Sequence, residues 1–175
     1  PDTIGCFPHS VQFYDSSSSN VVYRHWIFGN GNSSVGNAVT PSAIYTSPGV
    51  YSVTLVVSDG VDTVSITKSN YIHSLAKPTA SFTNQNTTTG CSPFAFQVYD
   101  NSFSTTAPIS AWEWDFDDGT PLVYSQSPMH TYINSGVFNV ALKVTDTNGC
   151  SNTTVQTNLV TVLPQPMANF SSAVP

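Results

Sequence analysis

An internal repeat constrains this chain of 175 residues more than any other feature of its sequence. The matching anchors keep one order along the chain, at offsets of 85, 88 and 87 residues: Cys6 with Cys91, Trp26 with Trp114, and Tyr45 with Tyr132. A repeat of this length is that of one small domain, so the chain must fold as consecutive copies of a single structural unit.

The phase of the repeat predicts the domain boundaries. The segment 77–82 opens the second copy, and the similar segment 165–170 opens a third. We therefore predict a first domain over 1–76, a second over 77–164 and the start of a third repeat over 165–175. The first copy has only five residues before its cysteine, so we expect it to lack the opening strand that the second copy has.

The composition and the local patterns both favour an all-β fold. Ser, Thr, Asn, Val and aromatic residues are abundant and strong helix formers are few, with 12 Pro and 10 Gly to make turns. Apolar residues alternate with polar ones over 51–58 and again over 138–145, which is typical of half-buried strands. About seven short strands per copy, separated by turn residues, predict an antiparallel β-sandwich for each copy.

The second copy carries a motif that resembles the PKD (polycystic kidney disease) domain, an immunoglobulin-like sandwich. The motif reads Trp-Asp-Phe-Asp-Asp-Gly over 114–119, followed by His-Thr-Tyr over 130–132 and a Ser-Gly turn at 135–136. The copies depart from the family pattern at Asn30, where Asp is usual, and at Asp117, where Gly is usual. The resemblance covers essentially the whole chain and implies tandem PKD-type sandwiches.

Repeated PKD copies with cysteines placed as here look like those of long surface and secreted proteins of Bacteroidetes-type bacteria. The resemblance therefore implies an extracellular spacer or adhesive stalk exported by type IX secretion. Its partners would be neighbouring repeats and a surface polysaccharide or protein ligand. Two alternatives stay open: a carbohydrate-binding accessory module of a secreted hydrolase, and a filament subunit that shares strands with its neighbours.

Charge and motifs argue against several other functions. The four cations are scattered and the formal net charge is −6, so we expect no nucleic-acid binding. No apolar run is long enough to span a membrane. The four His lack metal-ligand spacing, Glu113 is the single Glu, and no hydrolase or phosphate-loop motif occurs. We therefore expect no catalytic activity and no organic cofactor.

The chain has three cysteines, and only two of them fall within the same copy: Cys6 lies in the first copy, and Cys91 and Cys150 lie in the second. Cys91 and Cys150 both belong to the second copy, one near its start and one after its long alternating strand. We predict a disulfide between them and a free thiol at Cys6, with pairing of Cys6 outside this segment as the alternative.

Two further groups are candidate binding residues. Asp115, Asp117 and Asp118 crowd one turn and could bind Ca²⁺, although their spacing is not that of a calcium loop, and the alternative is a turn shaped by Asp118 and Gly119. Trp112 and Tyr124 could stack on sugar rings, since the first copy has Arg24 in place of Trp112. The alternative for Trp112 is an aromatic cover over the sandwich edge.

Overall fold

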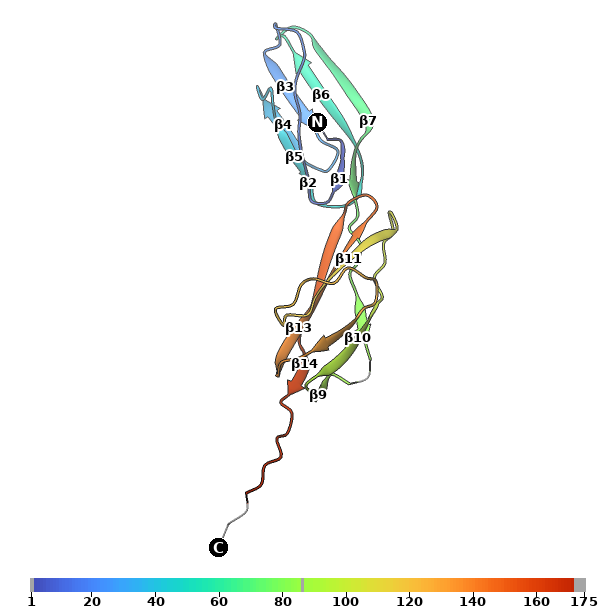
Figure 1. The fold of residues 1–175 in the computed structure, drawn as a ribbon. Helices are drawn as coiled ribbons and strands as arrows, with labels where there is room; N and C mark the ends of the chain where they lie inside the picture. Colours follow the sequence, from blue (N-terminus) through green and yellow to red (C-terminus); the bar gives the residue numbers. More distant parts are fainter. Residues whose placement is uncertain (1, 86, 172–175) are drawn as a thin grey trace. The chain divides into compact units, whose positions relative to one another are not determined.

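Fourteen β-strands and no helix make up the regular structure of residues 2–85 and 87–171, the part of the chain described by a computed structural model (Figure 1). The chain divides into two units, Pro1–Lys77 and Pro78–Pro175. The predicted all-β fold is confirmed. The third repeat predicted over 165–175 carries no strand in its described part, 165–171, and residues 172–175 lie outside the described residues.

The first unit holds seven strands in two sheets. The larger sheet has the order β1-β7-β6-β3-β4, and β2 pairs with β5 in the smaller one. The strand bounds are β1 Ile4–Cys6, β2 His9–Gln12, β3 Tyr23–Ile27, β4 Ser33–Gly36, β5 Ser42–Tyr45, β6 Gly49–Ser58 and β7 Thr63–Leu75.

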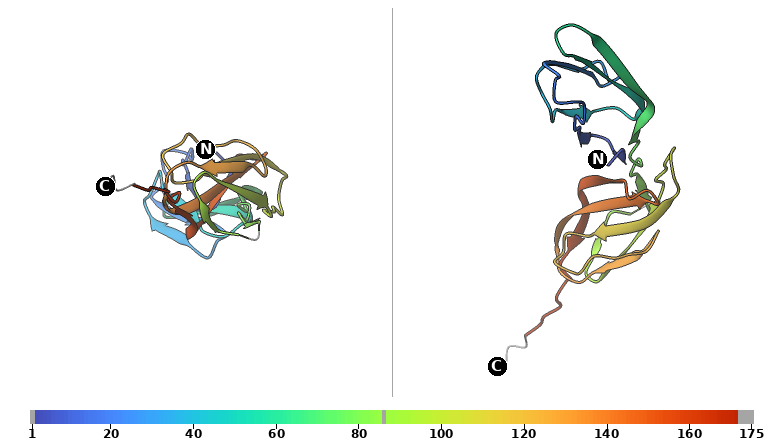
Figure 2. Two further views of the ribbon diagram at one scale, coloured as in Figure 1. Left: turned by 60° about the horizontal axis from the view of Figure 1, so that its bottom comes forward. Right: turned by 90° about the horizontal axis from the view of Figure 1, so that it is seen from above.

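The second unit also has seven strands in two sheets, with one strand fewer in its larger sheet and one more in its smaller sheet. One sheet has the order β11-β13-β14-β9 and the other the order β12-β10-β8. The strand bounds are β8 Phe82–Asn84, β9 Thr89–Cys91, β10 Phe94–Asp100, β11 Ile109–Asp115, β12 Met129–Tyr132, β13 Gly136–Asp146 and β14 Ser151–Leu163. The views in Figure 2 show the strands of each unit in facing layers, which is the arrangement of a β-sandwich.

The long hairpins β6–β7 and β13–β14 place the predicted alternation in the core. Val53, Leu55 and Val57 of β6 are buried, and the residues between them face outward. In the second unit β13 buries its residues in the same alternation. Because successive side chains of a strand point to opposite faces, this pattern fixes which face of each sheet meets the other.

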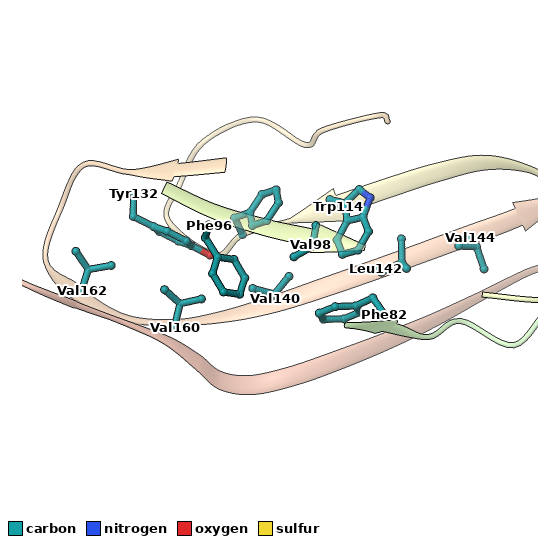
Figure 3. Close-up of a cluster of buried hydrophobic side chains, with 11 residues drawn as sticks. Phe82, Phe96, Val98, Trp114, Tyr132, Val140, Leu142, Val144, Val160 and Val162 are labelled. Atoms are coloured by element: carbon teal, nitrogen blue, oxygen red, sulfur yellow. The ribbon is translucent and has the colours of Figure 1, made fainter. Parts of the chain in front are cut away.

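Each unit has its own buried core. That of the second unit surrounds Trp114, with Phe82 of β8 packed against the indole at a ring-centroid distance of 5.1 Å (Figure 3). That of the first unit surrounds Trp26 and Phe28, with Phe13 tilted against both rings. The two cores are separate clusters, so each sandwich is stabilised by its own hydrophobic burial.

The units differ at one edge of the smaller sheet. In the second unit β10 pairs with β12 on one side and with β8 on the other, through Val98 opposite Asn84 and Asp100 opposite Phe82. In the described part of the first unit, β2 pairs with β5 and has no strand on the other side. That the first unit lacks its opening strand stays a prediction; within the described residues, β2 has a partner strand on one side only.

Candidate functional site

The acidic turn of the second unit starts where β11 ends, at Asp115. Asp117 has a positive φ of 59°, and its N–H donates to Oδ1 of Asp115 at 2.9 Å. The Asp117 carboxylate accepts a hydrogen bond from Nδ2 of Asn139 at 2.7 Å. The left-handed backbone at Asp117 is the conformation that Gly29 adopts at the equivalent position of the first unit, with a φ of 77°.

Asp118 turns toward a different set of partners. One carboxylate oxygen accepts from the N–H and the hydroxyl of Thr120, and the other lies 2.8 Å from Nε2 of His130. The His130 ring stacks on Phe116 with centroids 4.2 Å apart. Burial alone would raise the pKa of Asp118, but the hydrogen bonds from Thr120 and His130 outweigh it and hold the pKa below its ordinary value.

Tyr132 lies next to this turn, in the core behind it. Burial raises the pKa of the Tyr132 phenol well above its ordinary value, and the negative charges of Asp118, Asp117 and Asp115 add to the effect. The phenol is therefore neutral at physiological pH, and the acidic turn lies over an uncharged aromatic core.

The three Asp of the turn have separate hydrogen-bonding roles. Asp115 and Asp118 accept from N–H groups two residues ahead, whereas Asp117 reaches across to Asn139. Within residues 2–85 and 87–171, no group of three or more His, Cys, Asp or Glu is placed to hold a metal ion. Ca²⁺ binding here stays a prediction, and the described contacts are those of a turn.

The cysteines do not pair as predicted. Cys91 is free and exposed, whereas Cys6 and Cys150 are disulfide-bonded, so both the bond between Cys91 and Cys150 and the free thiol at Cys6 were wrong. Strand register gives the reason. Cys91 lies opposite Leu163 at the end of β14, and Cys150 precedes Ser151 at its start. A strand of this length separates the two by about 40 Å, at about 3.3 Å per residue, whereas a disulfide needs Cα atoms within roughly 7 Å.

The two candidate sugar-stacking aromatics lie in different environments. Trp112 is partly buried against the core, and its indole N–H donates to a carboxylate oxygen of Asp100 at 2.7 Å. Tyr124 is exposed to 70% of its surface. Trp112 therefore has a structural role at the sandwich edge. Of these two candidates, Tyr124 is the one with an exposed aromatic ring.

A groove in the first unit was missed by the sequence analysis. It has a volume of about 340 Å³, and its lining residues include Tyr14, Trp26, Val53, Leu55, Lys68 and Tyr71. This volume falls within the range of ligand-binding clefts, roughly 300–1,000 Å³. One signal in the sequence points to it: the lining residue Ile66 holds the β7 position where β14 has Thr154.

Comparisons with known proteins agree with this architecture. One model of the PKD domain matches residues 75–162, and a second matches residues 5–71. The described part of the chain contains no helix long and apolar enough to cross a membrane.

Several solved structures are similar to half of the chain or to nearly all of it. The PKD1 domain of Vibrio anguillarum Epp is 26% identical, covers 50% of this chain and 96% of that one, and has a TM-score of 0.43. The PKD1 domain from the Vibrio cholerae metalloprotease PrtV is 27% identical, covers 49% and 98%, and has a TM-score of 0.42. Fibronectin(III)-like modules of Clostridium thermocellum CbhA are 12% identical, cover 98% and 94%, and have a TM-score of 0.47.

Proposed function

Because the chain belongs to the PKD domain family, we propose that it is a non-catalytic extracellular segment that spaces and presents other parts of a large surface or secreted protein. The observation that carries this proposal is the presence of two sandwiches in succession, each closed around its own core. Residues 76–81 lie between the last strand of the first unit and the first strand of the second. A spacer needs folded units joined by a short link, because a long flexible link would not hold a distance.

The polar side chains support a role without catalysis. The carboxylates of the acidic turn accept hydrogen bonds that shape the turn, and Glu113 pairs with Lys143 at 2.8 Å. The pKa of Asp118 is lowered, whereas a general acid at neutral pH needs a raised one. These groups are used to build the sandwich.

Composition and cysteine chemistry support the extracellular location. The chain has 8% charged residues and relies on hydroxyl and amide side chains for its polar surface. Cys6 and Cys150 are disulfide-bonded, and disulfides form and persist mainly in oxidising compartments outside the cytosol. Neighbouring repeats of the same kind are the partners that this role requires.

Single-molecule force spectroscopy under reducing conditions tests the spacer role directly. Pulling the chain by its two ends should give two separate unfolding steps, each releasing about 3.3–3.6 Å per unfolded residue. The Trp26→Ala variant should lose the step of the first unit and Trp114→Ala that of the second, because each indole is buried at the centre of one core. A gradual extension without steps would contradict the role of a folded spacer.

Two assays separate the spacer from the other functions. Hydrolase assays on polysaccharide, peptide and ester substrates should show no turnover above the blank, and activity lost on replacing one Asp would overturn the proposal. Pull-down with insoluble polysaccharides should retain no chain. Retention that Tyr124→Ala abolishes would instead support a carbohydrate-binding module.

A further inference from the structure

We propose that Asn148 is a site of spontaneous deamidation, a modification that converts its side-chain amide to a carboxylate. The chain contains two Asn-Gly pairs, Asn30-Gly31 and Asn148-Gly149, and each lies in the turn of an antiparallel hairpin. Glycine has no Cβ to keep its nitrogen away from the preceding side chain, so an Asn-Gly pair is open to this reaction. The hydrogen bonds of the two amides distinguish one pair from the other.

The reaction consumes one water molecule and needs no other reactant. The nitrogen of Gly149 loses its proton and attacks Cγ of Asn148, the bond from Cγ to Nδ2 breaks, and ammonia leaves with the proton. Water then opens the resulting succinimide ring at either carbonyl, which gives aspartate or isoaspartate. The attack depends on bringing the nitrogen and Cγ together, so it is favoured where the side chain can move without giving up other contacts.

The amide of Asn30 is held at both of its polar atoms. Its Oδ1 accepts a hydrogen bond from the N–H of Asn32 at 3.1 Å, and its Nδ2 donates one to the carbonyl of Ile44 at 3.0 Å. Ring closure at Asn30 would break the bond to Ile44, because Nδ2 is the atom that leaves. Each hydrogen bond that must be given up raises the barrier, so the fold protects this pair.

The amide of Asn148 lacks this protection. Asn148 is exposed in the turn between β13 and β14, and its side chain makes no hydrogen bond within residues 2–85 and 87–171. The N–H of Gly149 donates to the carbonyl of Asp146 at 2.9 Å, so the turn must open before its nitrogen can react. Exposed loop tips are among the segments that open most easily, whereas the side chain of Asn148 needs no release at all.

The product would alter the turn around Asp146. Asp146 is buried, and its Oδ1 accepts hydrogen bonds from the N–H of Asn148 at 3.0 Å and from that of Cys150 at 2.9 Å. A carboxylate at position 148 adds a second negative charge to this turn. Isoaspartate also lengthens the main chain by one carbon between β13 and β14. We therefore expect hydrogen exchange of 146–151 to become faster after conversion.

The first experiment follows both pairs in one sample by mass-spectrometric peptide mapping of the intact chain, kept in warm and mildly alkaline buffer. We expect Asn148 to convert at least about tenfold faster than Asn30, since a difference of about 1.4 kcal/mol in barrier height suffices. In concentrated guanidinium chloride, where both turns lose their hydrogen bonds, the two residues should convert at similar rates. Equal rates in the folded chain, faster conversion of Asn30 or no conversion of Asn148 would overturn the proposal. So would a rate difference that persists in the denaturant, because the cause would then not be the fold.

The second experiment uses Asn148→Gln as the matched variant, which keeps an amide at this position but would have to close a larger ring. Isoaspartyl methyltransferase should label the aged unchanged chain at position 148 and leave the aged variant unlabelled there. Hydrogen exchange of 146–151 should become faster with age in the unchanged chain alone. An equal increase in the variant, or labelling of the variant at position 148, would overturn the proposal.

Discussion

The carboxylate of Asp15 accepts a hydrogen bond from Nε of Arg24 at 2.5 Å, at the position where Asp100 accepts one from the indole of Trp112 in the second unit. Asp15 and Asp100 match in the repeat, and so do Arg24 and Trp112. The two donors also lie in matching strands, Arg24 in β3 and Trp112 in β11. Both sandwiches therefore have an N–H donor for this carboxylate, which is an arginine in the first unit and a tryptophan in the second.

Replacing the donor in the first unit should destabilise it. The Asp15 side chain is exposed to only 1%, so Arg24→Ala would leave a buried carboxylate with Ser17 as its remaining hydrogen-bond donor. We expect a loss of about 2 kcal/mol in the free energy of unfolding of the first unit. Arg24→Trp restores the donor found in the second unit and should lose less.

Hydrogen exchange with peptide-level resolution measures this effect in the intact chain. Peptides of the first unit report the change, and peptides of the second unit serve as the internal control. Equal losses for Arg24→Ala and Arg24→Trp would contradict the role of the N–H donor.

Acid should weaken the second unit through Asp118. Its pKa in the folded protein lies below the ordinary value of 3.8, because the hydrogen bonds from Thr120 and His130 outweigh the effect of burial. The carboxylate therefore stabilises the fold at pH values above 3.8, and this contribution is lost as the pH falls through the folded pKa. We expect Asp118→Asn to reduce the loss of unfolding free energy between about pH 5 and pH 2.

Urea unfolding at a series of pH values, read from peptides of the second unit, measures this dependence. Asp59→Asn is the matched control, since the pKa of Asp59 is also lowered but this residue lies in the first unit. The prediction fails if Asp118→Asn and the unchanged chain lose stability in parallel on acidification.

The close approach at Gly90 predicts a context-dependent substitution. A Cβ at Gly90 would collide with the ring of Phe94, which packs against the core. Gly90→Ala should therefore destabilise the second unit by about 1–3 kcal/mol. In a Phe94→Ala background the same change should cost much less, because the ring is gone. Thermal or urea unfolding of the unchanged chain, the two single variants and the double variant gives the coupling free energy between Gly90 and Phe94. Additive losses of stability would contradict the contact.

Much of the fold follows from the sequence because it is local and repeated. The alternation over 51–58 identifies a strand and the face it buries, and the Trp-x-Phe segment at 114–116 identifies the core below it. These signals depend on the period of a strand, which any single copy displays. A second copy then confirms the pattern at a fixed offset.

The cysteines and the groove could not be predicted in the same way, because both depend on distance in space. Cys91 and Cys150 share a unit, but the length of β14 separates them. The role of Trp112 was also hidden, since its hydrogen bond to Asp100 becomes visible only when the register of the strands is known. The groove depends on the volumes of the side chains that line it, such as Tyr14.

The thiols should react in a defined order. Cys91 is exposed and free, so iodoacetamide should alkylate it in the native protein. Cys6 and Cys150 are disulfide-bonded and should be alkylated only after reduction. Peptide mapping by mass spectrometry before and after dithiothreitol distinguishes the three. Native alkylation of Cys6, or its absence at Cys91, would contradict the assignment.

The first unit should open more readily than the second. Its edge strand β2 pairs with β5, whereas β10 in the second unit is covered by both β12 and β8. The free energy of local opening should be lower in the first unit, because its edge has fewer backbone pairs and its core leaves Leu55 partly exposed. In dilute protein, we expect the amides of 9–15 to exchange at least about tenfold faster than those of 94–100, since a difference of about 1.4 kcal/mol in opening free energy suffices.

The amides of β6 and β13 provide the comparison within each unit, because both strands lie between two partner strands. The exchange rates of β6 and β13 should differ less than those of 9–15 and 94–100, since β8 pairs with β10 alone and not with β13. Equal exchange of 9–15 and 94–100 in dilute protein would show that the strand beside β10 adds little stability.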